Sequence, residues 1–165
     1  AGLCPITEAN LGDGIFPAVD YLAPGGRFGV GTDSNILIDA AGELRALEYS
    51  QRLAHRARAL LADEAAPFVG ANLFGRAVHG GAQALGVPAG LAVGQAADIV
   101  SLDLDHPSFA GTDEATLLDR WIFAARGGAI DCVWRAGEKR VEKGRHVAAD
   151  TIAGAYRACL DRLLA

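Results

Sequence analysis

The sequence predicts an α/β fold in which two short strands and their helices come before a small β unit and a closing helix. Three observations predict it. Phe28-Gly29-Val30 is a short apolar run that suits a buried strand, and the carboxylate of Asp33 follows it closely. Helical apolar spacing then covers most of residues 39–85, and strand-like alternation returns after residue 97. A buried strand that delivers an Asp at its C-terminal end and leads into a helix is how (β/α) barrels present a catalytic group.

The composition is that of a folded domain. The chain has 165 residues, of which 51% are hydrophobic and 21% charged, so it can bury a core. A net charge of −5 argues against a nucleic-acid surface, and no apolar run approaches the ~20 residues of a membrane span. The three cysteines are far apart and form no Cys-x-x-Cys pair, which is typical of a reducing compartment. We therefore expect a cytoplasmic protein with neither nucleic acid nor membrane as its partner.

Residues 3–17 predict the end of a strand that runs into a long loop. Pro5 cannot donate a ladder hydrogen bond, so strand pairing should stop there. Polar residues and glycines then dominate until residues 18–23, which predict a short helix. The chain contains no Met, and its first residues already lie inside a motif. We expect it to begin in the middle of a larger protein.

Two longer helices are predicted after Asp33, at about residues 39–62 and at residues 68–85. In the first, Glu48 and Arg52 form an i,i+4 pair in the favourable order. The second contains four glycines, and each costs up to ~1 kcal/mol in a helix interior. Their number predicts close packing of this helix against another element.

The character of the sequence changes near residues 86–90, where we place a boundary between units 1–86 and 87–165. The second unit predicts a short-loop hairpin around Ala136-Gly137 and an amphipathic helix at the end of the chain. Its predicted elements are, in order, a strand at 97–103, a helix at 117–125, strands at 130–135 and 139–142, and a helix at 151–165.

On the residues alone, Asp33 has two interpretations. It is either a functional carboxylate at the end of a buried strand, or a residue that caps the next helix or shapes a turn. The histidines favour structural roles: His55 lies among arginines on a helix, and His106 beside Asp105 lacks the convergent ligands of a metal site. A dinucleotide site at Gly26, Gly29 and Gly31 is disfavoured because the glycine spacing is wrong.

Four segments taken together resemble the C-terminal part of an amidohydrolase-superfamily enzyme. Cys4-Pro5-Ile6-Thr7, with Asn10-Leu11-Gly12 and Gly14, resembles the loop after the seventh barrel strand, and Gly31-Thr32-Asp33-Ser34-Asn35 resembles the end of the eighth. Residues 80–100 resemble the last helix and the run into a small β-domain, and residues 133–146 resemble the terminal hairpin of that domain. The fuller strings at 3–17, 47–53 and 117–124 look most like N-formimino-L-glutamate deiminases of histidine breakdown. The alternative is an aminohydrolase acting on a purine or triazine ring.

The resemblance implies the C-terminal portion of a (β/α)8 metal-dependent hydrolase barrel, with its last two strands and helices, plus part of a small β-sandwich domain. It implies hydrolysis of N-formimino-L-glutamate to N-formyl-L-glutamate and ammonia with one divalent metal, zinc. Asp33 would bind the metal and accept a proton from the attacking water. The other family ligands are histidines outside this chain, because His55, His79, His106 and His146 match none of their positions. We therefore expect the chain alone to be inactive.

Glu8 and Asn10 are the candidates for substrate contact, with Asp13 on the same segment. By charge, Arg27 or Arg52 would suit the anionic glutamate tail better. The full-length enzyme is expected to be a homodimer that takes a small amidine substrate. A non-catalytic alternative makes residues 87–165 an assembly module and Asp33 a structural cap.

Overall fold

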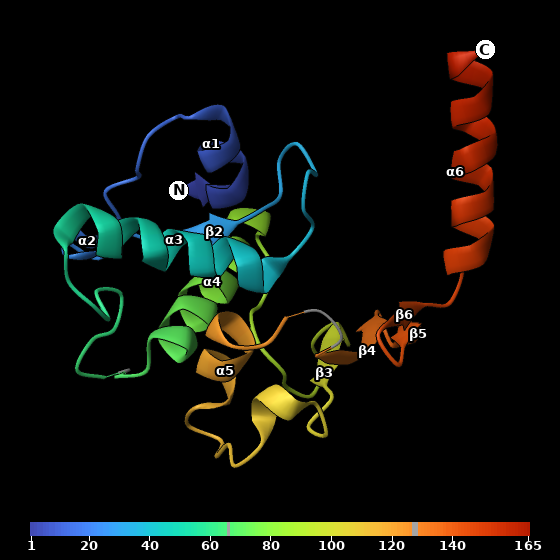
Figure 1. The fold of residues 1–165 in the computed structure, drawn as a ribbon. Helices are drawn as coiled ribbons and strands as arrows, with labels where there is room; N and C mark the ends of the chain where they lie inside the picture. Colours follow the sequence, from blue (N-terminus) through green and yellow to red (C-terminus); the bar gives the residue numbers. More distant parts are fainter. Residues whose placement is uncertain (66, 127–128) are drawn as a thin grey trace.

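Two sheets and a layer of helices make up the molecule (Figure 1). The computed structural model describes residues 1–65, 67–126 and 129–165. Strands β1 (Gly2–Leu3) and β2 (Gly29–Val30) pair in parallel, with Gly2 opposite Gly29 and Leu3 opposite Val30. A second, antiparallel sheet has the order β3 (Ile99–Leu102), β4 (Ile130–Arg135), β5 (Glu138–Glu142) and β6 (Arg145–His146). The helices are α1 (Pro5–Leu11), α2 (Ala18–Leu22), α3 (Ala40–His55), α4 (Val69–Leu85), α5 (Leu117–Phe123) and α6 (Ala149–Leu164), with a 3-10 turn η1 at Pro107–Phe109.

The segment after β1 is helical, so the expectation of a long loop within residues 3–17 is wrong. Pro5 is the first residue of α1, where its missing N–H leaves no helical hydrogen bond unmade and its fixed φ suits the helix. The carboxylate of Glu8 accepts the backbone N–H of Cys4 at 2.7 Å, and Gly12 ends the helix with a φ of 76°. A Pro at the start, an acidic residue in the first turn and a Gly at the end together indicate a helix. The interpretation of Pro5 as the end of a strand did not take this pattern into account.

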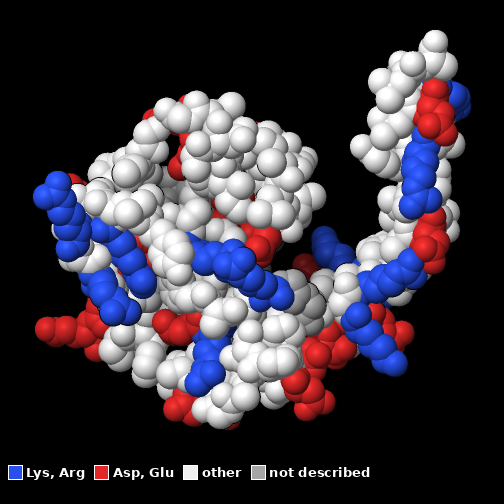
Figure 2. Space-filling view, in the orientation of Figure 1, with Lys and Arg blue, Asp and Glu red and all other residues white. Residues whose placement is uncertain are grey.

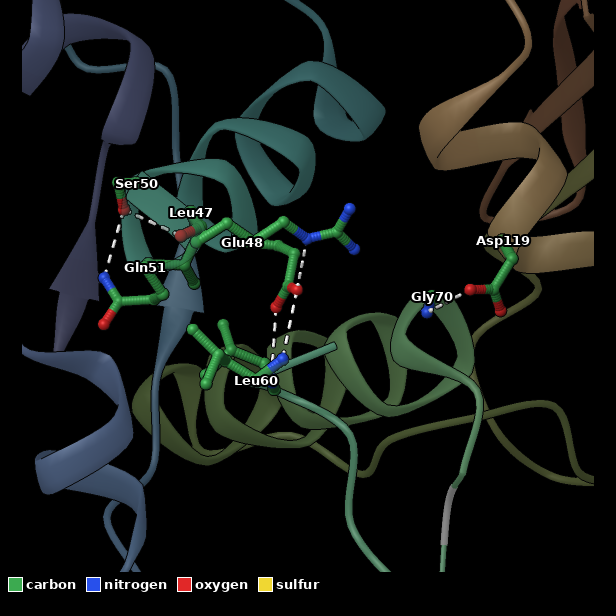
Figure 3. A network of polar contacts seen from close by, with 9 residues as sticks. Leu47, Glu48, Ser50, Gln51, Leu60, Gly70 and Asp119 are labelled. Atoms are coloured by element: carbon green, nitrogen blue, oxygen red, sulfur yellow. Dashed lines mark hydrogen bonds and ion pairs between the residues drawn. The ribbon is translucent and has the colours of Figure 1, made fainter. Parts of the chain in front are cut away.

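Helix α3 ends at His55, earlier than the end near residue 62 that the apolar pattern predicts. Arg56 takes a left-handed φ of 53° and the chain folds back towards α3. The buried carboxylate of Glu48 then accepts the backbone N–H groups of Leu60 at 3.2 Å and Leu61 at 3.1 Å (Figure 3). The apolar pattern continues past the helix because the returning segment, with Leu61 buried, also packs on the core.

Two of the four glycines in α4 approach the backbone of another element, as their number predicts. A Cβ atom on Gly80 would overlap the carbonyl oxygen of Phe28, directly before β2. A Cβ on Gly70 would lie 2.6 Å from the backbone nitrogen of Asp119 in α5. These approaches let α4 lie directly against β2 and α5, whereas a Cβ on Gly75 would meet open space.

The core lies between the β1–β2 pair and helices α3, α4 and α5. Arg45 of α3 donates to the carbonyl oxygen of Ile122 in α5 at 3.0 Å, so α5 is attached to the first half of the chain. The division into units 1–86 and 87–165 therefore stays a prediction. The largest apolar side chains of this core are Leu3, Phe28, Leu44, Leu47, Leu61, Leu73, Phe109, Trp121 and Ile122.

Strands β3, β4 and β5, the hairpin and the closing helix of the second half occur where the sequence predicts them, whereas the short strand β6 was not predicted. These strands form one four-stranded sheet in the described part of the chain, and the β-sandwich stays a prediction. Helix α6 leaves this sheet and projects away from the rest of the molecule, with none of its residues buried (Figure 1). On the face drawn in Figure 2, basic and acidic side chains lie interspersed along α6 and the neighbouring strands. Among the described residues, no helix combines the length and apolar character needed to cross a bilayer.

Helix α3 contains two buried carboxylates that differ in how far their oxygens are hydrogen-bonded. Glu48 is fully buried, and its oxygens accept three hydrogen bonds, including one from Nε of Arg52 at 2.7 Å. Glu43 is 1% exposed, and its Oε2 accepts the backbone N–H of Ile6 at 2.8 Å, while Oε1 has no partner among the described residues. Burial raises the pKa of Glu43; the Ile6 N–H opposes this, and nearby carboxylates add to it.

Replacing Gly80 by Ala should destabilise the fold by about 1–3 kcal/mol, because the new methyl group overlaps the Phe28 backbone and α4 must move. Gly75→Ala is the matched control. It should stabilise by up to ~1 kcal/mol, since Ala is the better helix former and nothing lies within 4 Å. Urea unfolding measures both free energies, and equal effects at the two positions would contradict the packing described.

Glu43→Gln should gain stability relative to the wild type as the pH rises from 4 to 8. The folded-state pKa of Glu43 lies above its unfolded value, so its contribution is fully present below about 4.3 and is lost as the pH rises through the folded pKa. A neutral amide does not undergo that loss. Urea unfolding at several pH values measures the difference, and a difference that is constant with pH would refute it.

Glu48→Gln, which breaks the ion pair with Arg52, should be less stable than the wild type at pH 8.

Candidate functional site

The carboxyl ends of β1 and β2 form one edge, because the two strands run in parallel. The backbone N–H of Gly31 donates to the carbonyl oxygen of Leu3 at 3.0 Å and continues the pairing to this edge. The chain after β1 enters α1 there, and the chain after β2 makes the turn that carries Asp33. Two segments about 25 residues apart in sequence, 4–8 and 31–35, therefore meet.

Asp33 lies in this turn and is exposed to solvent. Its φ is 43° and that of Asn35 is 54°, so both adopt the left-handed conformation that Asp and Asn tolerate best among non-glycine residues. The residue that precedes α3 in the cap position is Asp39, so Asp33 does not cap that helix. Among the described residues, the Asp33 carboxylate has no hydrogen-bond or ion-pair partner, so its oxygens face solvent at the strand edge.

Thr7 ties the two segments together on either side of Asp33. Its side chain is 2% exposed, and Oγ1 donates to the carbonyl oxygen of Thr32 at 3.1 Å. The same Oγ1 lies 3.0 Å from Oγ of Ser34. Neither Thr7 nor Ser34 was a candidate from the sequence, because a Thr or Ser contact across 27 residues leaves no local pattern.

The surroundings of this edge are acidic. Burial raises the pKa of the Cys4 thiol, and the carboxylates of Asp33, Glu43 and Glu8 raise it further, while the backbone N–H of Gly31 lowers it. The three carboxylates therefore lie within electrostatic reach of one sulfur. Such a field opposes further negative charge and favours a cation.

The two candidates for substrate contact on α1, Glu8 and Asn10, lie in different surroundings. Glu8 contributes to a cavity of about 290 Å³ between α1 and α3, lined also by Phe16, Leu47 and Ser50. One of its oxygens is already engaged by the Cys4 N–H. Asn10 is exposed and lies outside that cavity, as does Asp33, so the structure does not bring these candidates into one pocket.

Both arginines proposed for the glutamate tail are engaged elsewhere. Arg27 precedes β2, at the opposite end of the strand from Asp33, and donates to Oε1 of Gln83 at 2.7 Å. The guanidinium of Arg52 lies 5.3 Å from the ring centre of Tyr49 and 5.2 Å from that of Phe123, besides its contact with Glu48. The structure gives neither a position near the Asp33 edge.

The described residues include a possible metal ligand in Asp33 and do not make up a complete metal site. Across residues 1–65, 67–126 and 129–165, no three His, Cys, Asp or Glu side chains come together as ligands would. Ring nitrogens of three histidines instead contact nearby backbone, at Gly75, Ser108 and Ala148. Asp33 offers one suitable oxygen ligand, whereas zinc requires about four, so the described residues by themselves do not form a zinc site.

The sequence is similar to known proteins along nearly its whole length. The family model for the amidohydrolase family matches residues 1–140. Formimidoylglutamate deiminase of Pseudomonas aeruginosa is 48% identical over 165 residues, a match that covers 99% of this chain and 36% of that protein. The chain thus spans about a third of the length of this curated relative.

Two solved structures are similar to this chain in three-dimensional fold. The crystal structure of an amidohydrolase from Brucella melitensis superposes with a TM-score of 0.90 at 50% identity, covering 100% of this chain and 36% of that one. An adenosine deaminase from Xanthomonas campestris with bound zinc gives a TM-score of 0.79 at 25% identity, covering 98% and 36%. Together with the family match over residues 1–140, they show that this α/β chain belongs to the amidohydrolase family.

Proposed function

We propose that this chain is the C-terminal part of an iminohydrolase that converts N-formimino-L-glutamate and water to N-formyl-L-glutamate and ammonia. The observation that carries the proposal is the open carboxylate of Asp33 at the carboxyl edge of a parallel strand pair. Active-site groups of (β/α)8 barrels occupy that edge. The 48% identity to a formimidoylglutamate deiminase supports this choice of reaction.

In this proposal, β1 and β2 are the last two strands of a (β/α)8 barrel, and α3 and α4 follow the final strand. Two strands cannot close a barrel, so the remaining strands belong to another part of the protein. Residues 1–86 would complete the barrel, and residues 87–165 would contribute one sheet and α6 to a small β-sandwich domain. Structural likeness to chains of which this one covers 36% supports the assignment.

Asp33 would hold one divalent metal, zinc, together with histidines outside this chain. A bound metal supplies an acidified water at neutral pH, because it lowers the pKa of the water from ~15.7 towards ~7. In the overall hydrolysis, the C=N bond of the formimino group would be replaced by the C=O bond of the formyl group, and both hydrogens of the water would end on the departing nitrogen, one of them by way of Asp33. Asp33 would accept the proton that the water gives up, which is within reach of a carboxylate at the same edge. The zinc in the related adenosine deaminase supports the choice of metal.

The substrate choice rests on the comparison of relatives. Identity is 48% to the formimidoylglutamate deiminase and 25% to the adenosine deaminase, which favours an amidine over a purine ring. Glu8 and Asn10 remain proposals for the substrate mouth, and a homodimer in the cytoplasm without nucleic-acid or membrane partners remains the proposed setting. The alternative is a deaminase of a purine or triazine ring.

The full-length protein should release ammonia from N-formimino-L-glutamate and contain about one zinc per chain. Asp33→Ala should lower kcat by about 10²–10⁴-fold and lower the zinc content, because it removes a ligand and the proton acceptor together. Coupled ammonia assays and metal analysis measure the two effects. Activity on adenosine or a triazine in place of the amidine would favour the alternative. A metal-free protein with an unchanged Asp33→Ala variant would favour a non-catalytic assembly module.

The 165-residue chain expressed alone should show no such activity and bind zinc only weakly, since no three of its described His, Cys, Asp or Glu side chains come together as ligands would. Isothermal titration with zinc chloride, followed by the ammonia assay, checks this. Stoichiometric tight binding by the isolated chain would contradict the proposal that the other ligands lie outside it.

A further inference from the structure

We propose that Glu43 is a positioning residue for Asp33, which it orients through α1 and Thr7. The inference rests on the proposed function, because it assigns Asp33 a task that depends on position. It concerns two buried polar side chains, Glu43 and Thr7, neither of which faces the solvent at the strand edge.

The first step runs from Glu43 to α1. Oε2 of Glu43, in the first turn of α3, accepts the backbone N–H of Ile6 at 2.8 Å. That N–H belongs to the first turn of α1, whose amides have no partner within the helix. Glu43 therefore fixes the start of α1 against α3, across 37 residues of sequence.

The second step runs from α1 to the turn that carries Asp33. Thr7, the neighbour of Ile6, contacts the carbonyl oxygen of Thr32 at 3.1 Å and Oγ of Ser34 at 3.0 Å. These are the residues directly before and after Asp33. Movement of α1 would therefore be transmitted to both flanks of Asp33 at once.

Hydrogen bonds between Thr32 and Asn35 close the turn around Asp33, and the side chain of Thr7 ties this turn to α1. The left-handed backbone of Asp33 is a conformation that persists only where the surroundings enforce it, at a cost of order 1–3 kcal/mol. A ligand or proton acceptor must also be held to within about 0.5 Å of its working position. The contacts of Thr7 on both sides supply that constraint.

The unpartnered oxygen of Glu43 indicates that this carboxylate serves more than stability. A buried acceptor without a partner costs about 1–3 kcal/mol, and Oε1 is such an acceptor. Glu48, buried on the same helix, accepts three hydrogen bonds and holds the 60–61 segment instead. The two residues therefore form a matched pair, one tied to the Asp33 edge and the other remote from it.

The test uses the full-length zinc protein, five single variants and the double variant that combines Thr7→Val with Glu43→Ala. Thr7→Val keeps the shape of the side chain and removes its hydroxyl, while Thr7→Ser keeps the hydroxyl. Glu43→Ala removes the acceptor, while Glu43→Gln keeps one for the Ile6 N–H. Glu48→Ala is the control for a lost buried carboxylate. Readouts are kcat and KM for the amidine, zinc content, and hydrogen–deuterium exchange of peptides covering residues 31–36.

We expect Thr7→Val and Glu43→Ala each to lower kcat or zinc affinity by about 10–100-fold, with KM changed far less. Thr7→Ser and Glu43→Gln should restore most of the loss. The double variant should be little worse than the worse single one, because both act through α1. Glu48→Ala should unfold at lower urea concentration and keep its kcat and the exchange of residues 31–36.

Faster exchange at residues 31–36 in Thr7→Val and Glu43→Ala supports the inference whether or not the amidine is the substrate. If the wild type lacks zinc and activity, the proposed function fails, and the exchange measurement still decides the positioning role. Should Glu43→Ala fail to fold, the isosteric Thr7→Val decides alone. Loss of stability like that of Glu48→Ala, with kcat, zinc content and exchange at residues 31–36 unchanged, would overturn the inference.

Discussion

The parallel pairing of β1 with β2 is the constraint on which the rest of the structure depends. Only two residues of each strand pair, yet this aligns two carboxyl ends and so brings α1 beside the turn that carries Asp33. The pair is held from behind by α4, whose Gly80 lies against the backbone of Phe28. A short pair of strands keeps its register here because buried Leu3 and Phe28 anchor it in the core.

Strands, helices and the hairpin could be predicted where one local pattern dominated. The period of apolar residues located α4 and α6, and the short Gly turn at residues 136–137 located the β4–β5 hairpin. The prediction failed at α1, where Pro5 was interpreted as the end of a strand although Pro also begins helices. It failed again at the end of α3, because Leu60 and Leu61 extend the apolar pattern while belonging to a segment that folds back onto Glu48.

The place of Asp33 at a strand end could be predicted from its neighbours, but the residues that support it could not. Ile6 and Glu43 are 37 positions apart, and Thr7 and Ser34 are 27 apart. Contacts between residues so far apart in sequence follow from the tertiary fold and leave no periodic pattern in the sequence. The same limit applies to the arginines: charge suggested Arg27 and Arg52 for an anionic substrate, and packing places one at the far end of β2 and the other beside two stacked aromatic rings.

In the proposed enzyme, this chain contributes one carboxylate and the framework that orients it, and the remaining ligands come from elsewhere in the protein. An anomalous difference map of the full-length crystal, collected at the zinc absorption edge, tests this most directly. The account predicts a peak about 2.0–2.2 Å from an oxygen of Asp33, at the carboxyl edge of β1 and β2. A zinc peak far from Asp33, with its carboxylate still facing solvent, would contradict it.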